Sequence, residues 1–459
     1  MSNIAKVKTS WGLSGRVIET PPNAASSLAH GRQVFSNGQV LPGGSGNLLA
    51  GLELIRGLAC LQVLLSHIFL VLMLHSRVKL GPGFWKLAVL DWSYQSVMVF
   101  FVLSGFVIAI SQQRKQQNFA SFMRSRFRRL EPLYLVAVAF SFALEFFFYP
   151  PPTPGALAGH LFCVQGTNFA PVFSINTPLW SLSYEFFFYL MFACTIGRNQ
   201  KPLQLCWFVL GLAAMTCNLA GYTAPGSLGF FQSILSLSPV WLLGTFLVDR
   251  PFCARASLIQ RFMLFGMLPL ATHSLPFLGS PNSPAHSFVM ALLIAPLLHA
   301  AARTGPLQSH SRPLIWGVLG GLYFTFASSA LLSNRGMNHH TEIVFALLTP
   351  FLFLGLVPLY HLLFRDAPFF SPTVTRFSLW LGKMSYAIYI IHFPLLIVLG
   401  AVMRNPLLQI AADILLVIPV AWLLTYFLEP VLVAIFDRLW PAAAKSALTV
   451  KRAYQMNPP

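Results

Sequence analysis

Residues 51–74 read GLELIRGLACLQVLLSHIFLVLML, an apolar run with two ionisable side chains, Arg56 and His67, in its interior. The run is long enough to cross a bilayer as a helix, which takes about 20 residues. Arg56 and His67 are about three helical turns apart, so they lie on one face, about 16 Å apart along the axis. Because an ionisable group in hydrocarbon costs about 2.5 kcal/mol or more, this face should border protein or a wet cavity. Both residues are therefore candidates for function.

The rest of the chain is similarly apolar. Of 459 residues, 56% are hydrophobic and 9% are charged, and the mean hydropathy is +0.67. In lipid, apolar blocks of about twenty residues must be helical, because their backbone polar groups have no water to bind. The sequence therefore predicts an all-α polytopic integral membrane protein, a bundle of about 10–12 transmembrane helices. The expected spans are 51–74, 92–111, 133–149, 179–197, 203–222, 227–248, 258–279, 285–302, 314–333, 342–364, 381–402 and 409–436.

Positive charge is distributed unevenly between the gaps that separate these spans. If the chain starts in the cytoplasm, 23 of its 30 Lys and Arg residues fall on the inner side and 5 on the outer side. Cytoplasmic loops carry such an excess, so we expect both termini in the cytoplasm and the protein in the cell (inner or plasma) membrane. The bias also accounts for the net charge of +18 without nucleic acid as a partner.

The composition divides the chain into three regions. We expect a disordered polar cytoplasmic tail at 1–49, a transmembrane core at 50–437 and a cytoplasmic C-terminal tail at 438–459. The outer segment 150–178, which begins with prolines and has no Lys or Arg, is either an entrance for a substrate or a lid without substrate contact. The six cysteines show no metal-binding spacing and no disulfide framework, and no metal site is expected. No bound cofactor is expected either.

Arg56 needs an anionic partner because arginine keeps its charge in proteins. The partner is either Glu53, one turn earlier, or a ligand. His67 can exchange protons near neutral pH. With the N-terminus inside, Arg56 lies near the inner surface and His67 near the mid-plane. The structural alternative is an Arg–Glu pair at the interface, with His67 hydrogen-bonded between helices.

A basic loop is expected at 122–135, FMRSRFRRLEPLYL, where four arginines occupy six positions. Pro132 suits the first turn of the helix that follows. Guanidinium groups bind phosphate bidentately, so Arg126 and Arg129 are candidates to hold a phosphorylated donor at the inner face. The alternative is a stop-transfer anchor that also contacts anionic lipid.

A polar stripe is expected in residues 176–192, NTPLWSLSYEFFFYLMF, where Ser181, Glu185 and Tyr189 are spaced i, i+4, i+8. Trp180 suits the outer membrane interface. A buried Glu185 can orient a histidine, accept a substrate proton or pair with arginine. The alternative is an interhelical hydrogen bond by a protonated carboxyl group.

A second stripe is expected in residues 381–396, LGKMSYAIYIIHFPLL. Ser385, Tyr389 and His392 share one helical face, and Pro394 can loosen the helix. The alternative is that these side chains only bind neighbouring helices, as Ser, Tyr and His often do in membranes.

Taken together, the chain resembles the integral-membrane acyltransferase-3 family, which transfers acyl groups, usually acetyl from acetyl-CoA, to carbohydrates and other acceptors. The similar blocks are ELIRGLA followed by His67, VFFVLSGFVI at 99–108, RFRRLEP at 126–132, LWSLSYEFFFYL at 179–190 and LGKMSYAIYIIHFP at 381–394. The family usually has Asp where this chain has Glu53 and Gly where it has Ser96. Its core is usually described with fewer helices than the spans predicted here.

The resemblance implies a membrane O-acyltransferase that moves an acyl group, most often acetyl, from cytosolic acyl-CoA to a hydroxyl of a carbohydrate such as a lipid-linked or surface polysaccharide. Arg126 and Arg129 would bind the donor, and Arg56 would neutralise charge nearer the thioester. His67 would deprotonate the acceptor or carry the acyl group, with Glu185 as partner or acceptor-side group. The supporting candidates are Glu53, Ser104, Trp180, Ser181, Ser385, Tyr389 and His392.

The expected partners are acyl-CoA as co-substrate, a carbohydrate or glycolipid acceptor and the bilayer, while the oligomeric state stays open. Two other classes compete with the enzyme. Intramembrane Arg, His and Glu also suit a proton-coupled secondary transporter with helices broken at Pro394 or Pro419. A catalytically silent receptor or scaffold would tolerate substitution of Arg56 and His67.

Overall fold

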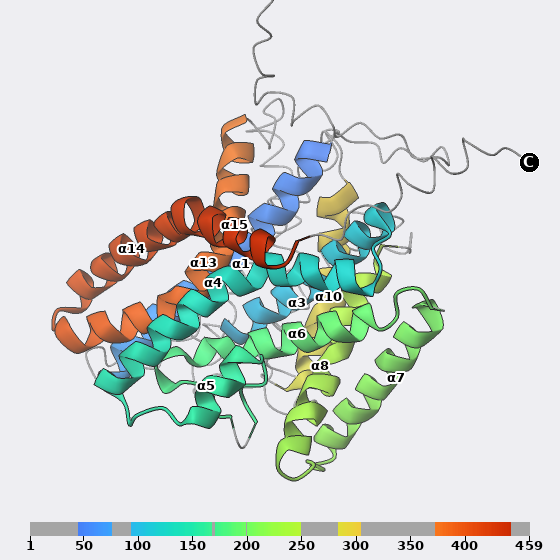
Figure 1. Ribbon diagram of the computed structural model, residues 1–459, viewed down its shortest axis with the longest axis horizontal. Coiled ribbons are helices and arrows are strands. Elements are labelled where there is room, and N and C mark those ends of the chain that lie inside the picture. Colours follow the sequence, from blue (N-terminus) through green and yellow to red (C-terminus); the bar gives the residue numbers. More distant parts are fainter. Residues whose placement is uncertain are drawn as a thin grey trace, which may run out of the picture. The chain divides into compact units, whose positions relative to one another are not determined.

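The computed structural model describes residues 45–75, 93–167, 170–198, 200–248, 283–303 and 372–441. Within these ranges every regular element is a helix (Figure 1), and the only extended pairing is one isolated bridge between Thr167 and Ala170. The helices are α1 (Ser45–Leu74), α3 (Ser93–Lys115), α4 (Phe119–Phe148), α5 (Pro154–Leu161), η2 (Ser174–Leu179), α6 (Trp180–Ala193), α7 (Gln200–Leu219), α8 (Ser227–Phe246), α10 (Pro284–Arg303), α13 (Pro372–Val402), α14 (Pro406–Leu423), η5 (Leu424–Leu428) and α15 (Glu429–Leu439).

Seven helices of the described residues are long and apolar enough to cross a membrane, which confirms the all-α, multi-pass prediction. They are Ala50–Leu74, Ser93–Lys115, Phe119–Phe148, Gln200–Leu219, Ser227–Phe246, Thr375–Val402 and Pro406–Leu439. Each of the seven corresponds to a predicted span. The last runs through α14, η5 and α15 without a break, and η5 is a π-helical turn.

Two predicted spans, 179–197 and 285–302, are helices that do not meet the same test. The first corresponds to α6, whose 14 residues give about 21 Å, less than a hydrocarbon core of about 30 Å. The second corresponds to α10. The predicted spans 258–279, 314–333 and 342–364 lie outside the described residues, as do residues 1–44 of the predicted N-terminal tail.

The basic loop predicted at 122–135 is wrong, because these residues belong to helix α4. The helix begins after Asn118, whose side chain accepts a hydrogen bond of 2.9 Å from the backbone N–H of Ser121, and Pro132 lies in its interior. Arg, Met and Leu are good helix formers, so nothing local interrupts the helix before the proline. The sequence interpretation took dense charge as a sign of a loop, whereas the charge lies on a helix.

Helices α1 and α13 pack along each other (Figure 1). Their close approach depends on small residues, since a methyl group added at Gly57 would collide with Leu381 of α13. The Cys60 thiol lies 3.1 Å from the Ser385 carbonyl oxygen. Contacts further along both helices follow in the same order, so α1 and α13 run parallel. Residues at the same depth of the two helices therefore lie side by side.

Helices α3 and α8 cross with their backbones almost in contact. A methyl group on Gly105 would collide with the carbonyl oxygen of Trp241, and one on Gly244 would collide with that of Val102. Only glycine at both positions permits this crossing. Ser104, the neighbour of Gly105 on α3, therefore lies next to this crossing.

The described residues of segment 150–178 are tied to the bundle by buried polar groups. The Glu145 carboxylate of α4 accepts hydrogen bonds from the backbone N–H groups of Ser174 (3.0 Å) and Ile175 (2.8 Å). The side-chain amide of Asn176 donates to the Ile390 carbonyl oxygen of α13 at 3.0 Å. The end of this segment is therefore anchored to two of the long helices.

Candidate functional site

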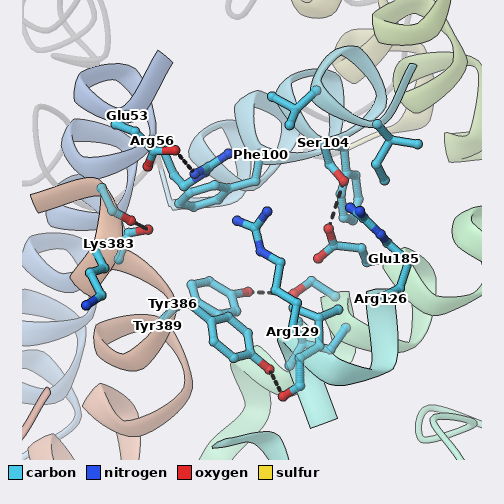
Figure 2. Close-up of a pocket in the computed structure, with 18 of the residues that line it drawn as sticks. Glu53, Arg56, Phe100, Ser104, Arg126, Arg129, Glu185, Lys383, Tyr386 and Tyr389 are labelled. Carbon is cyan, nitrogen blue, oxygen red and sulfur yellow. Dashed lines mark hydrogen bonds and ion pairs between the residues drawn. The ribbon is translucent and has the colours of Figure 1, made fainter. Parts of the chain in front are cut away.

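A cavity of about 520 Å³ lies between α1, α3, α4, α6 and α13, and α15 contributes one residue to its wall (Figure 2). We call it the arginine cavity. Its charged lining residues are Glu53, Arg56, Arg126, Arg129, Glu185, Lys383 and Glu429. Ser104, Ser181, Ser385 and Tyr389 also line it. The structure therefore brings together most of the site residues that the sequence predicted, from helices far apart in the chain.

Arg56 is paired with Glu53, the nearer of the two partners that the sequence allowed. One guanidinium nitrogen lies 2.5 Å from a Glu53 carboxylate oxygen, and the two side chains are 13% and 14% exposed. Since both residues line the arginine cavity, this pair forms part of its wall.

The four arginines of α4 divide between two faces of the helix. Arg124 and Arg128 face away from the cavity and form ion pairs with Asp437 of α15, at 2.7 and 2.9 Å. Arg126 and Arg129 line the cavity, and the Arg129 guanidinium points into it (Figure 2). The spacing of these residues on the helix therefore places Arg124 and Arg128 on one face and Arg126 and Arg129 on another.

Neither of the two α4 arginines in the cavity forms an ion pair with a carboxylate of the described residues. Arg126 is only 8% exposed, and its Nε lies 3.3 Å from the Ser125 hydroxyl. Its guanidinium also lies 5.4 Å from the centre of the Phe122 ring. A buried guanidinium without a carboxylate partner is costly unless an anion compensates it. The arrangement therefore suits an anionic ligand.

Glu185 faces the same cavity and is held by two hydroxyl groups. It accepts a hydrogen bond of 2.8 Å from Ser104 of α3 and another from Tyr189 of α6. Figure 2 shows its carboxylate beside Arg126. The position beside Arg126 agrees with the predicted pairing of Glu185 with an arginine. The hydrogen bonds to Glu185 come from Ser104 and Tyr189 and not from a histidine.

Tyr389 and Ser385 carry the polar stripe of α13 to the cavity wall. The Tyr389 hydroxyl donates to the Pro178 carbonyl oxygen at 3.0 Å and lies 2.7 Å from the Ser181 hydroxyl. The Ser385 hydroxyl donates to the Gly382 carbonyl oxygen. Tyr389 thereby links α13 to the start of α6.

His67 and His392 do not line the arginine cavity but contact each other, and we call them the histidine pair. Nδ1 of His67 lies 2.8 Å from Nε2 of His392, and the two rings are nearly parallel, with centroids 5.0 Å apart. Nδ1 of His392 lies 2.8 Å from the Tyr389 carbonyl oxygen. His392 is fully buried, whereas His67 is partly exposed. The predicted stripe of Ser385, Tyr389 and His392 therefore spans two sites.

Trp180 is half-buried and stands apart from both sites. Its ring stacks on Tyr94 with centroids 5.8 Å apart and meets Tyr184 edge to face. It belongs to an aromatic cluster between α3 and α6.

Sequence reasoning missed three functional candidates: Lys383, Tyr386 and Glu429 all line the arginine cavity. Lys383 lies 4.1 Å from the centre of the Tyr426 ring, and the Tyr386 hydroxyl donates to the Leu130 carbonyl oxygen at 2.9 Å. Lys383 and Glu429 are charges within or at the end of apolar runs, and the rule that singled out Arg56 would have found them. No group of three or more His, Cys, Asp or Glu that could hold a metal occurs in the described part of the chain.

Comparison with known proteins agrees with the resemblance seen in the sequence. A family model described as an acyltransferase domain, that of the acyltransferase-3 family, matches residues 49–426. Acyltransferase MdmB of Streptomyces mycarofaciens is 38% identical over 128 residues, which cover 26% of this chain and 33% of that protein. The match therefore spans about a third of the relative's length. No solved structure matches the chain significantly.

Proposed function

Since the chain belongs to the acyltransferase-3 family, we propose that it transfers an acyl group, acetyl in the first instance, from cytosolic acyl-CoA to a hydroxyl group of a carbohydrate acceptor. The acceptor would be a lipid-linked or surface polysaccharide, and the enzyme would lie in the cell membrane with both termini in the cytoplasm. The family does not favour the alternative of a proton-coupled transporter. The activity named for the relative MdmB, acyl transfer, agrees with the proposal.

The observation that carries the proposal is that the two α4 arginines of the cavity, Arg126 and Arg129, form no ion pair with a carboxylate of the described residues. A phosphate group would compensate Arg126 and Arg129 and accept bidentate hydrogen bonds from their guanidinium groups. Acyl-CoA is a polyanion with its thioester at the end of a long neutral arm. Phosphates held on α4 would leave that arm to extend along α1 and α13, past Tyr389, toward the histidine pair.

The transfer step needs a base for the acceptor and a proton for the leaving group. In the proposal, His67 takes the proton of the acceptor hydroxyl group while the hydroxyl oxygen bonds to the thioester carbonyl carbon. The carbon–sulfur bond then breaks, and His67 returns the proton to the thiolate of CoA. The other mode, in which His67 itself carries the acyl group, predicts an acyl-enzyme that accumulates when acceptor is absent.

The test uses membranes that contain the protein, incubated with acetyl-CoA labelled in the acetyl group. We expect the label to appear in the glycan or glycolipid fraction, at a rate that depends on the protein. A transporter would leave the label on CoA or as free acetate. The absence of labelled glycan, glycolipid and lipid products from membranes with folded protein would overturn the proposal.

Two variants on one helix connect the activity to the cavity. Arg129→Gln removes a guanidinium that points into the cavity, so transfer should require a higher concentration of donor. Arg128→Gln removes the neighbouring charge, which faces Asp437 instead, and should leave the donor requirement unchanged. Equal effects of the two substitutions would indicate a general charge effect and contradict a donor site in the cavity.

A further inference from the structure

The histidine pair is anchored at one end to the backbone of α13, and this fixes where its protons lie. Nδ1 of His392 lies 2.8 Å from the Tyr389 carbonyl oxygen and 3.0 Å from that of Ile388. A carbonyl oxygen can only accept a hydrogen bond, so Nδ1 of His392 must carry the hydrogen. A neutral imidazole has one N–H group, so Nε2 of His392 carries a lone pair.

That lone pair determines the tautomer of the second ring. Nε2 of His392 lies 2.8 Å from Nδ1 of His67, so it accepts the hydrogen bond and Nδ1 of His67 donates it. The one hydrogen of neutral His67 is then on Nδ1, and its Nε2 carries the lone pair. Within the part of the chain that the structure describes, no hydrogen bond to Nε2 of His67 is present.

Packing holds the His67 ring in this orientation. The His392 ring lies almost parallel to it, at an interplanar angle of 20°, and the Phe393 ring meets it nearly edge-on, with centroids 5.1 Å apart. His392 is fully buried and lies on the same helix as both carbonyl groups. Among the described residues, His392 is the only titratable group whose hydrogen bond reaches His67. The ring is therefore fixed by one hydrogen bond and by two aromatic neighbours.

We propose that His392 is a positioning residue, which holds His67 in the Nδ1–H tautomer and thereby presents its Nε2 lone pair as the base for the acceptor hydroxyl. Its part in transfer rests on the proposed function, whereas the tautomer does not. In the transfer step the hydroxyl proton moves to Nε2 of His67, and the resulting positive charge is stabilised by the hydrogen bond to His392. Nε2 later gives the proton to the CoA thiolate, which restores the starting tautomer.

The direct test is nitrogen NMR of the purified protein, with ¹⁵N-labelled histidine, in lipid nanodiscs at neutral pH. The His67 signals are identified as those lost in the His67→Ala variant. We expect Nδ1 of His67 to be protonated and Nε2 to be unprotonated. The opposite tautomer, or an equal mixture of the two, would overturn the proposal whether or not the protein transfers acyl groups.

Two variants of His392 test its part in the reaction. His392→Leu keeps apolar volume but removes the acceptor, so we expect kcat to fall about 10- to 100-fold, by analogy with the loss of a partner that orients a metal-ligating histidine. The KM for the donor should not change, since phosphate binding lies elsewhere. His392→Gln can place an amide oxygen where Nε2 was, and it should restore much of kcat and the Nδ1–H tautomer.

The matched control is Phe393→Leu, which removes the other aromatic neighbour of His67 but no hydrogen bond. We expect a smaller fall in kcat and an unchanged tautomer. If His392→Leu and Phe393→Leu lower kcat equally and both leave the tautomer of His67 as it was, His392 acts only by packing and the proposal is wrong. If no variant or wild-type sample transfers acyl groups while the Nδ1–H tautomer is observed, the proposed function fails and the positioning remains.

Discussion

The arginine cavity and the histidine pair are both built on α1 and α13, yet they differ in kind. The cavity gathers charges of both signs from α1, α4, α6, α13 and α15, and its two α4 arginines form no ion pair with a carboxylate of the described residues. The histidine pair is two rings from two helices, with its hydrogen bonds completed by backbone carbonyl groups. One region has two arginines that form no ion pair among the described residues, and the other has a fixed hydrogen-bond geometry.

This difference teaches that residues on one helix face need not belong to one site. Arg56 and His67 lie on the same face of α1, but only Arg56 lines the cavity. In the proposed enzyme the cavity binds the donor, and His67 of the histidine pair takes part in the transfer step. Substitutions in the arginine cavity should therefore change binding of the donor, and substitutions in the histidine pair should change the rate of transfer. Four experiments test this separation.

The largest effect is expected for His67→Ala. Loss of a general base lowers the rate by about 10² to 10⁴-fold, while binding of acyl-CoA in the arginine cavity should remain. The measurements are single-turnover transfer from labelled acetyl-CoA and equilibrium binding of the same donor to protein in nanodiscs. Transfer at the parent rate by a folded variant would remove His67 from the reaction. Loss of donor binding as well would contradict the separation of donor binding from transfer.

The next effect is expected for Arg126→Gln. A hydrogen bond to a charged group contributes about 1.5–3 kcal/mol, so the Kd for acyl-CoA should rise about 10- to 100-fold, with little change in kcat. An acyl-pantetheine donor, which lacks the phosphates of the nucleotide end, should bind the variant and the parent equally. Arg124→Gln, on the outward face of α4, is the matched control and should bind acyl-CoA normally. If Arg126→Gln weakens the binding of acyl-CoA and of acyl-pantetheine equally, Arg126 contacts a part of the ligand other than the phosphates.

The cavity could be predicted from the sequence as far as helical periodicity extends. Ser181, Glu185 and Tyr189 all reach the cavity, as their spacing on one face requires. The helix that carries Arg126 was predicted as a loop, because dense charge outweighed helix propensity in that interpretation. Periodicity also joined His392 to Ser385 and Tyr389, although a helix that rotates past a cavity presents its successive turns to different neighbours.

The rest of the site depends on tertiary structure. Glu429 reaches the cavity only because α15 packs against α4, and no local pattern indicates that contact. The pairing of His67 with His392 likewise depends on α1 and α13 running parallel in register. Two isolated histidines in apolar helices do not reveal which of their neighbours they meet.

A smaller effect is expected for Tyr389→Phe, which tests the residue that the arginine cavity and the histidine pair share. The hydroxyl group contacts Ser181 and Pro178 at the cavity wall, whereas the carbonyl group accepts the hydrogen bond from His392. The substitution removes only the hydroxyl, at a cost of about 0.5–1.5 kcal/mol. We expect the KM for the donor to rise about two- to tenfold, with the His67 tautomer unchanged by nitrogen NMR. A changed tautomer would mean that the hydroxyl, and not the backbone, sets the histidine pair.

The smallest effect is expected for Asp437→Asn, which removes the carboxylate between Arg124 and Arg128. Exposed ion pairs contribute little to stability, so thermal unfolding and transfer should change little. The variant nevertheless frees Arg124 and Arg128, which lie on the face of α4 that points away from the cavity. If Asp437→Asn tightens acyl-CoA binding as strongly as Arg126→Gln weakens it, the donor phosphates also reach the outer face of α4. The boundary of the binding region would then lie at α15 and not at the cavity wall.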